Sequence, residues 1–514
     1  IFAAGGARAR RPPGATRDWS SPPPPPPPPA RRARRARRAR VITSLLARGA
    51  RSDVFLANDA SREASTSSRR SKPSNETKPS EAKRTLLREH LHDALYALNK
   101  GYFTNDRKTS APVGTMDEGA IDFKALRGQD DYFGELNRRY ARLGAQWLTP
   151  GEIFAPHYAD ALVRYILETH RGDCGDDEAL EPLRVYEIGG GAGTFASGFL
   201  DAVKREAPKV YEKMRYTSID ISKRLCDDQL NRVRRSGHAN DVHDATVGDA
   251  TSLQTWGATN EETCFVIALE VLDNLPHDRV WRPKRGEGEW MQTEIVRNLT
   301  TGELAQREAP LADALIQRTL QAIDLTADLA VDGDGGAYNP RGFMHSIRRA
   351  LTSLASSGDE TWFVPTGSMQ LMETLHAKRP NHRFIAADFD TLPNVRIEGV
   401  NAPLVATQRV GGQTDDHDTY LLPERLAGSA DVFFPTCFDT LRAIDFATSS
   451  QNTHRANARL CTIVTTKKFM TDYADVAATV TGSGYNPLLQ DFSNTKFLLS
   501  GAPAHPHDHD HDDH

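Results

Sequence analysis

Cysteine is scarce in this chain of 514 residues. The five cysteines lie far apart and form no C-x-x-C pair, so neither a disulfide framework nor a structural zinc is expected. Long apolar runs are missing as well, because no segment reaches the ~18 uninterrupted apolar residues that a membrane-spanning helix needs. We therefore expect a reduced compartment, no bound metal and no membrane span, in a protein that is soluble or peripheral.

Acidic residues are nearly absent from the first 52 positions. These positions contain thirteen arginines and one acid, Asp18, whereas the whole chain has a net charge of −4. The remaining residues therefore carry −16. Such an acidic body disfavours nucleic acid as a partner, because phosphates are contacted mainly by Lys and Arg.

Residues 1–83 have the composition of a disordered leader. Eight consecutive prolines, Pro22–Pro29, predict a polyproline II rod. The Arg- and Ala-rich segment 30–51 that follows is free of acids, which is typical of an amphipathic mitochondrial targeting helix. A low-complexity leader without an address, or a basic arm that touches nucleic acid, fits the same composition. At the other end, residues 501–514 alternate His with Asp and predict a flexible tail.

Hydrophobic periodicity divides the rest of the chain into two parts. Residues 84–180 predict a helical N-terminal cap, with an amphipathic helix over 84–99 and a helix break at Thr149 and Pro150. From 181 to 500, short apolar runs alternate with helical stretches, which indicates an α/β core with a parallel sheet. An insertion is expected around 282–360, with a loop at 331–342. Helices are predicted at 194–206 and 223–235, and strands at 185–188, 215–219, 245–247 and 264–269, with 361–364, 383–387, 461–465 and 496–499 able to complete the sheet.

The turn after the first predicted strand is rich in glycine, with four glycines among residues 189–193. Such a turn lets a ligand approach backbone N–H groups at the start of a helix. A dinucleotide site would need a third glycine at position 194, or at 196 in a second register, where the chain has Thr194 and Ala196; this interpretation is weakened but stays open. A purely steric origin of the glycines also stays open. The full pattern is similar to the first motif of class I S-adenosylmethionine methyltransferases: Glu187, Gly189, Gly191 and Gly193.

Acids also stand at the ends of the next predicted strands. Asp220 lies 27 residues beyond Gly193 and could accept hydrogen bonds from both ribose hydroxyls, while Asp249 could accept one from the adenine amino group. Glu270 and Asp273 follow the fourth strand and could grip a cationic acceptor such as a guanidinium. Each acid could instead cap a strand or a helix. Taken together, the ordered matches predict binding of S-adenosyl-L-methionine.

With these motifs the chain resembles the MidA family of methyltransferases over roughly residues 101–500. The resemblance implies a Rossmann-like class I fold with a seven-stranded, mostly parallel sheet, a helical N-terminal cap and insertions. It also implies that Thr149 and Glu152 lie near the cofactor, beside the glycine turn and Asp220. Four further segments look most like the divergent fungal and protist branch of the family: "WFVPTG", "HRFIAADFDTLP", "NAPLVATQR" and "GYNPLLQDFSNTKFLLS". The matching stretches are "GYF" (Gly101–Phe103), "LTPGEIFAPHYADALVRYIL" (Leu148–Leu167), "VYEIGGGAGT" (Val185–Thr194), "VIALEVLDNLPHDRV" (Val266–Val280) and "ADVFFPTCF" (Ala430–Phe438).

The family includes a mitochondrial assembly factor of respiratory complex I that methylates protein arginine. The resemblance therefore implies a protein arginine methyltransferase of the mitochondrial matrix, acting on a complex I core subunit, with Glu270 and Asp273 as catalytic residues. Two alternatives stay open. One is a non-catalytic assembly factor that holds the cofactor as a structural ligand, and the other is a methyltransferase for a small molecule or RNA, of which the acidic body disfavours RNA.

Overall fold

The computed structural model describes one unit of the chain, from Ala82 onward and with gaps. The described residues are 82–105, 113–116, 118–143, 146–174, 181–283, 288–328, 359–409, 413–423, 426, 428–452 and 461–501. The expected loop at 331–342, the tail beyond residue 501 and nearly all of the leader lie outside them. The exceptions in the leader are Ala82 and Lys83, which belong to a strand.

A seven-stranded sheet lies at the centre of this unit, so the α/β class is confirmed. Its strand order is β14-β15-β10-β5-β2-β3-β4. The four neighbouring pairs from β10 to β4 are parallel, whereas β15 is antiparallel to both β10 and β14. The chain order reverses between β2 and β5, and in parallel sheets ligands bind at such a reversal. The bounds are β2 (Arg184–Ile188), β3 (Arg215–Asp220), β4 (His243–Val247), β5 (Cys264–Leu269), β10 (His382–Phe389), β14 (Cys461–Thr465) and β15 (Thr495–Ser500).

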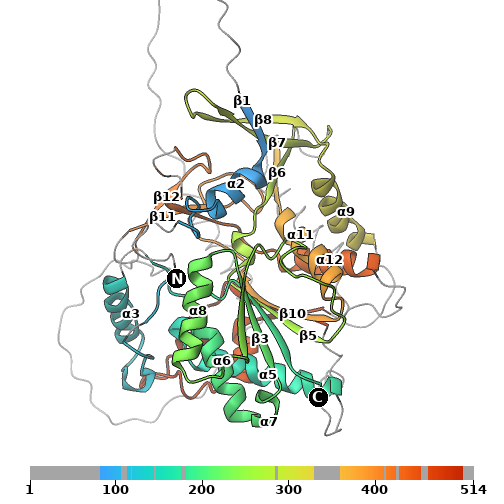
Figure 1. Ribbon diagram of the computed structural model, residues 1–514. Helices are drawn as coiled ribbons and strands as arrows, with labels where there is room; N and C mark the ends of the chain where they lie inside the picture. Colours follow the sequence, from blue (N-terminus) through green and yellow to red (C-terminus); the bar gives the residue numbers. More distant parts are fainter. Residues whose placement is uncertain are drawn as a thin grey trace, which may run out of the picture. The chain divides into compact units, whose positions relative to one another are not determined.

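Helices cover both faces of this sheet (Figure 1). Side chains alternate along β5, so that Phe265 and Ile267 pack in one apolar cluster while Val266 and Ala268 pack in another; this is the two-residue period of a strand buried on both faces. The first cluster includes α5 (His157–Cys174), α6 (Thr194–Glu206) and α13 (Thr466–Tyr473). The second includes α9 (Ala314–Asp328), α11 (Thr366–Lys378) and α12 (Phe438–Asn452).

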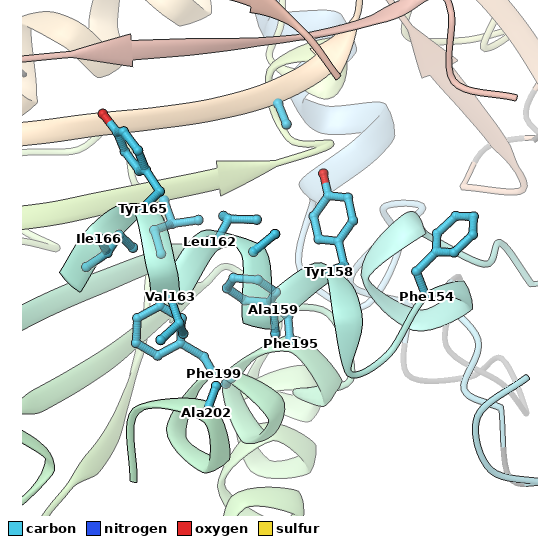
Figure 2. Packing of buried hydrophobic residues seen from close by; sticks show 14 of the residues in the cluster. Phe154, Tyr158, Ala159, Leu162, Val163, Tyr165, Ile166, Phe195, Phe199 and Ala202 are labelled. Carbon is cyan, nitrogen blue, oxygen red and sulfur yellow. The ribbon is translucent and has the colours of Figure 1, made fainter. Parts of the chain in front are cut away.

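The contact between α5 and α6 shows how closely this layer packs. Figure 2 shows Phe195, Phe199 and Ala202 of α6 against the side chains of α5. A Cβ atom on Gly198 would lie 3.3 Å from Ala159 Cβ, so a small residue is needed where the helices cross. In the same view, the Tyr158 hydroxyl points away from this contact.

Two smaller sheets are entirely antiparallel. The first joins β1 (Ala82–Leu86), β6 (Asp278–Arg282), β7 (Met291–Asn298), β8 (Leu304–Pro310) and β9 (Glu360–Val364), and the second joins β11 (Leu404–Gln408), β12 (Thr414–His417) and β13 (Ala430–Phe433). Eight of the twelve strand pairs in the described chain are therefore antiparallel. A mostly parallel arrangement holds for the central sheet alone. The expectation that 361–364 completes the central sheet was wrong, because β9 pairs with β6.

The expected helix over 84–99 is also corrected at its start. Residues 84–86 belong to β1, which pairs with β7 more than 200 residues away, and α2 begins only at Leu87 (Leu87–Tyr96). After α2 the backbone turns back on itself, and a Cβ atom on Gly101 would lie 2.5 Å from the Tyr96 nitrogen. Glycine in the "GYF" stretch therefore allows this close approach.

The remaining helices range in length from 3 to 15 residues. At the predicted break, Pro150 occupies the first turn of α4 (Pro150–Ile153), and the Thr149 side chain before it makes no capping hydrogen bond. None of the helices in the described part of the chain has the length and apolarity to cross a membrane. The other helices are η1 (Phe123–Ala125), α3 (Gln129–Leu143), α7 (Pro208–Tyr211), α8 (Lys223–Arg235), η2 (Leu272–Asn274) and α14 (Pro487–Gln490).

Candidate functional site

A cavity of about 610 Å³ lies at the carboxyl ends of the parallel strands. It is lined by the segments that follow β2, β3, β4 and β5, by the start of α4 and by α2. Two of the ten residues predicted for the site, Gly193 and Asp273, are not among its lining residues. The other eight are: Thr149, Glu152, Glu187, Gly189, Gly191, Asp220, Asp249 and Glu270.

The glycine turn is shaped by close contacts. Gly189, Gly191 and Gly193 have φ angles of 68°, 52° and 80°. Residues other than glycine rarely adopt this backbone conformation. A Cβ atom on Gly189 would lie 2.8 Å from Val271 Cγ2, and one on Gly193 would lie 2.7 Å from the Gln229 Cα atom. Gly189 and Gly191 line the cavity, whereas Gly193 lets α6 begin against α8.

Gln229 of α8 joins the glycine turn to the end of β3. Its Nε2 group donates to the Gly191 carbonyl at 2.9 Å and to Asp220 Oδ2 at 3.3 Å, and the residue is fully buried. This residue was not predicted for the site. A single glutamine on a polar helix carries no pattern that separates it from the exposed residues beside it.

Two buried acids lie at the ends of β2 and β3. Tyr216 donates its hydroxyl hydrogen to Glu187 Oε2 at 2.9 Å, and the Ser222 amide donates to Asp220 Oδ1 at 2.9 Å. Burial raises the pKa of Glu187 and of Asp220 to about 7 each, and these hydrogen bonds only partly offset that effect. Both carboxylates are thus oriented by the protein while their desolvation is incompletely compensated.

Asp249, after β4, is held from two directions. Thr251 donates to Asp249 Oδ1 from its amide at 2.8 Å and from its hydroxyl at 2.7 Å. The Nε2 atom of His92 lies 3.2 Å from Asp249 Oδ2. Burial acts to raise the pKa of Asp249, but hydrogen bonds from His92 and Thr251 outweigh it and the pKa lies below its ordinary value. His92 was not predicted for the site.

Helix α2 turns one face toward the cavity and the other toward the core. Leu87, Leu91 and Leu95 are buried in an apolar cluster. The helix is anchored by Arg88, which donates to Asp278 Oδ2 at 2.6 Å and to Asp313 Oδ2 at 2.7 Å. The cavity face carries charge and two aromatic rings at helical spacing: Arg88, Glu89, His92, Asp93 and Tyr96.

Glu270 follows β5 with a backbone that residues with a side chain seldom adopt. Its φ angle is 53°, which is unusual for a residue other than Gly, Asn or Asp. Its Oε1 atom is buried and has no hydrogen-bond partner among the described residues. Burial raises the pKa of Glu270 to about 8, and the negative charge of Asp388 adds to the increase. A strained residue with an unsatisfied buried acceptor is a strong candidate for ligand contact.

Asp273 lies behind the cavity and not on it. The residue is 2% exposed, and its amide donates to Asp388 Oδ2 at 3.0 Å. Burial and the nearby Asp388 and Asp431 raise the pKa of Asp273 well above its ordinary value. The neighbouring Asn274 lines the cavity instead. The structure therefore brings Glu270 to the cavity and keeps Asp273 apart from it.

The two residues predicted near the cofactor from the "LTPGE" stretch also line the cavity. Thr149 precedes the first turn of α4, and Glu152 lies within that turn. Glu152 is buried, and its Oε1 atom accepts a hydrogen bond from the Met116 amide at 2.5 Å. One carboxylate oxygen of Glu152 is therefore used to fix the segment that closes this side of the cavity.

Comparisons with known proteins place the chain in a family. A family model described as "Putative S-adenosyl-L-methionine-dependent methyltransferase" matches residues 161–457, which is more than half of the chain. The protein arginine methyltransferase NDUFAF7 homolog, mitochondrial, of Schizosaccharomyces pombe is 23% identical over 231 residues, covering 43% of this chain and 46% of the relative. The chain thus matches this curated relative over about half of the relative's length.

A solved structure shares the fold. The crystal structure of a methyltransferase-like protein of Burkholderia thailandensis bound to S-adenosyl-homocysteine has a TM-score of 0.50, with 15% sequence identity. The match covers 81% of this chain and 88% of that one. At this identity the likeness concerns the fold alone.

The residues at the cavity fit the cofactor of this family. Asp220 offers a buried, oriented carboxylate at the end of β3, and a carboxylate there suits the two ribose hydroxyls. At the turn before it, a Cβ atom on Gly190 would lie 2.7 Å from Glu187 Oε2, so the backbone passes close to the Glu187 carboxylate at the cavity. The glycine turn, the acids at the strand ends and the family match all point to the same cofactor. The chain belongs to the MidA family of S-adenosyl-L-methionine-dependent methyltransferases, and its cofactor is S-adenosyl-L-methionine.

Proposed function

We propose that this protein transfers a methyl group to the guanidinium of a protein arginine. The observation that carries the proposal is the Glu270 carboxyl group, whose Oε1 atom is buried without a hydrogen-bond partner among the described residues. Glu270 lines the same cavity as Asp220 and the glycine turn. A guanidinium would supply the missing donors, since it can give two parallel N–H groups to one carboxylate.

The charge of the site supports a cationic acceptor. Burial raises the pKa of Glu270 to about 8, so the free site holds a carboxyl group whose ionisation is disfavoured. A bound guanidinium would favour the ionised form, because an opposite charge nearby lowers the pKa of a carboxyl group. Binding of a cation and ionisation of Glu270 would therefore promote one another.

Glu270 can also accept the proton that the acceptor nitrogen loses. The cofactor supplies an electrophilic methyl group on a sulfonium, and the protein must align the acceptor nitrogen with it. A carboxyl group whose pKa lies near the working pH is suited to remove a proton during such a step. Asp273 takes part in this proposal through the loop it shares with Glu270, since it does not line the cavity.

The cellular setting and the wider fold assignment belong to the proposal as well. We propose a mitochondrial matrix protein whose substrate is a core subunit of respiratory complex I. The Arg-rich leader and the MidA resemblance support this, and the matched relative is named as a mitochondrial protein arginine methyltransferase.

We further infer a Rossmann-like class I core over residues 181–500, capped by residues 84–180. The reversal of strand order between β2 and β5 supports that inference.

The test is methyl transfer from labelled cofactor to complex I core subunits and to arginine, lysine and small-molecule acceptors. Label recovered as methylarginine is the expected result. Glu270→Gln should lower transfer about 100-fold or more, within the range for loss of an acid–base group, while calorimetry shows unchanged cofactor affinity. Glu262→Gln serves as the matched control, since Glu262 is an exposed glutamate that pairs with Arg184.

Three outcomes would reject the arginine proposal. Transfer only to lysine or only to a small molecule would assign another acceptor. Full activity of Glu270→Gln would remove the proposed role of its carboxylate. Cofactor binding without transfer to any acceptor, together with complex I assembly unaffected by Glu270→Gln, would favour the non-catalytic assembly factor.

A further inference from the structure

We propose that Asp388 is a positioning residue for methyl transfer, which holds the loop 270–274 so that Glu270 faces the cavity. This inference rests on the proposed function of Glu270. Asp388 lies in β10, directly beside β5 in parallel register, with Ala387 opposite Leu269. The two strands therefore reach the same edge of the sheet together, and the loop after β5 begins next to Asp388.

The Asp388 carboxylate collects backbone N–H groups from this loop. Its Oδ2 atom accepts a hydrogen bond from the Asp273 amide at 3.0 Å, and the nearby amides of Val271 and Leu272 act to lower the pKa of Asp388. Its Oδ1 atom accepts from the amide of Phe389 at 2.7 Å. One buried carboxylate thus holds the loop at the third residue after Glu270, so the loop cannot unwind there without losing this hydrogen bond.

Further contacts hold the same loop at both ends. The Glu270 amide donates to the Ala387 carbonyl at 2.8 Å, and the Phe434 amide donates to the Asp273 carbonyl at 2.8 Å. The Asn274 side chain donates to Asp431 Oδ1 at 2.8 Å. A left-handed backbone at a residue such as glutamate persists only where the surrounding structure enforces it. Asp388 supplies the central part of that enforcement for Glu270.

The charges of the loop support the same assignment. Asp273 and Asp388 are both fully buried and close together, so they resist ionising at the same time. Burial raises the pKa of Asp388, and the backbone N–H groups around it partly offset that effect. Burial and the neighbouring Asp388 and Asp431 raise the pKa of Asp273 well above its ordinary value. Asp388 is therefore the first of the two to ionise. Its negative charge also raises the pKa of Glu270.

The experiment compares the full chain with Asp388→Asn, a substitution that keeps the shape and removes the charge. Asp390→Asn is the matched control, because Asp390 lies two residues away and pairs with Lys496 at the surface. Hydrogen exchange of a peptide that covers residues 269–276 is followed by mass spectrometry. In Asp388→Asn this peptide should exchange at least tenfold faster than in the wild type and in Asp390→Asn.

Kinetics then separate positioning from general loss of structure. For an arginine peptide, Asp388→Asn should lower kcat about 10- to 100-fold, while the cofactor Kd changes less than twofold. The lower-pH limb of kcat/KM should move to lower pH, because removal of the Asp388 charge lowers the pKa of Glu270. In the Glu270→Gln background, Asp388→Asn should cause little further loss, since both changes act through the same group.

The two proposals fail in different ways. A wild-type protein that never methylates arginine would overturn the proposed function, while the exchange of peptide 269–276 still decides whether Asp388 holds the loop. Unchanged exchange in Asp388→Asn, or additive losses in the double variant, would overturn the role of Asp388. If Asp388→Asn does not fold, Asp388→Ser is measured by the same criteria, because its short hydroxyl cannot replace the carboxylate that accepts from the Asp273 amide.

Discussion

Two halves of the same sheet edge hold their acids in different ways. The adenosyl side is the name used here for the side that we propose for the adenosyl group, which is formed by β2, β3 and β4. There Asp220 and Asp249 each accept a hydrogen bond from an amide two residues along the chain, at Ser222 and Thr251. On the acceptor side, the side formed by β5 and β10 that we propose for the acceptor, the loop after β5 is held by Asp388, 115 residues beyond Asp273. These two acids of the adenosyl side are therefore oriented in part by local structure, whereas the loop of the acceptor side depends on a partner from a distant strand.

The largest expected effect tests the adenosyl side. Asp220→Ala should weaken binding of S-adenosylhomocysteine at least 100-fold in calorimetry, because two hydrogen bonds to a charged acceptor are lost. Each such bond contributes about 1.5–3 kcal/mol, and about 1.4 kcal/mol corresponds to tenfold in affinity. Asp227→Ala, on the exposed face of α8, should bind as the wild type does. An unchanged Kd in Asp220→Ala would show that this carboxylate does not hold the ribose.

The same division explains what the sequence predicts and what it misses. The helices at 194–206 and 223–235 and the strand at 264–269 match α6, α8 and β5 residue for residue, because their apolar periodicity and glycine boundaries are local signals. Asp220 and Asp249 follow from strand ends in the same way. The α/β class and the family are confirmed as well.

What the sequence misses depends on partners far away in the chain. Residues 84–86 have helical spacing, yet they form a strand because β7 provides its pairing edge. Residues 361–364 look like any other short strand, and only the pairing with β6 places them outside the central sheet. In the sequence, Asp388 resembles an ordinary acid at the end of a strand. Only the pairing of β10 with β5 brings it to the loop after β5. Asp273 and Glu270 are both acids that follow the strand at 264–269, so the sequence does not distinguish them. In the folded loop, Glu270 lines the cavity and Asp273 does not.

A second prediction asks whether Gly193 serves packing or the cofactor. Gly193→Ala should lower the free energy of unfolding by about 1–3 kcal/mol more than Gly237→Ala, because only the former forces an atom into its neighbour. Both residues have φ near 80°, but a Cβ atom on Gly237 meets nothing within 4 Å, whereas one on Gly193 meets α8. Chemical denaturation without cofactor measures the difference. Equal losses in the two variants would mean that α8 adjusts freely and that the contact is unimportant.

The smallest expected effect concerns the contact of His92 with Asp249, which links α2 to the adenosyl side. His92 has a raised pKa, first because of its hydrogen bond with Asp249, so the pair stabilises the fold while His92 is protonated. This contribution is fully present below the ordinary histidine pKa of about 6.5 and is lost as the pH rises through the higher folded pKa.

His92→Gln keeps a donor on α2 but removes the charge. Both side chains of the pair are about one-third to two-fifths exposed, so the expected loss is only about 0.2–1 kcal/mol at low pH. Thermal unfolding from pH 5.5 to 8.5 should show a lower Tm for the variant at pH 5.5 and a difference that closes toward pH 8.5. If the difference stays constant across this range, the imidazole stabilises α2 by packing, and the adenosyl side has no charge-dependent contact with the N-terminal segment at this point.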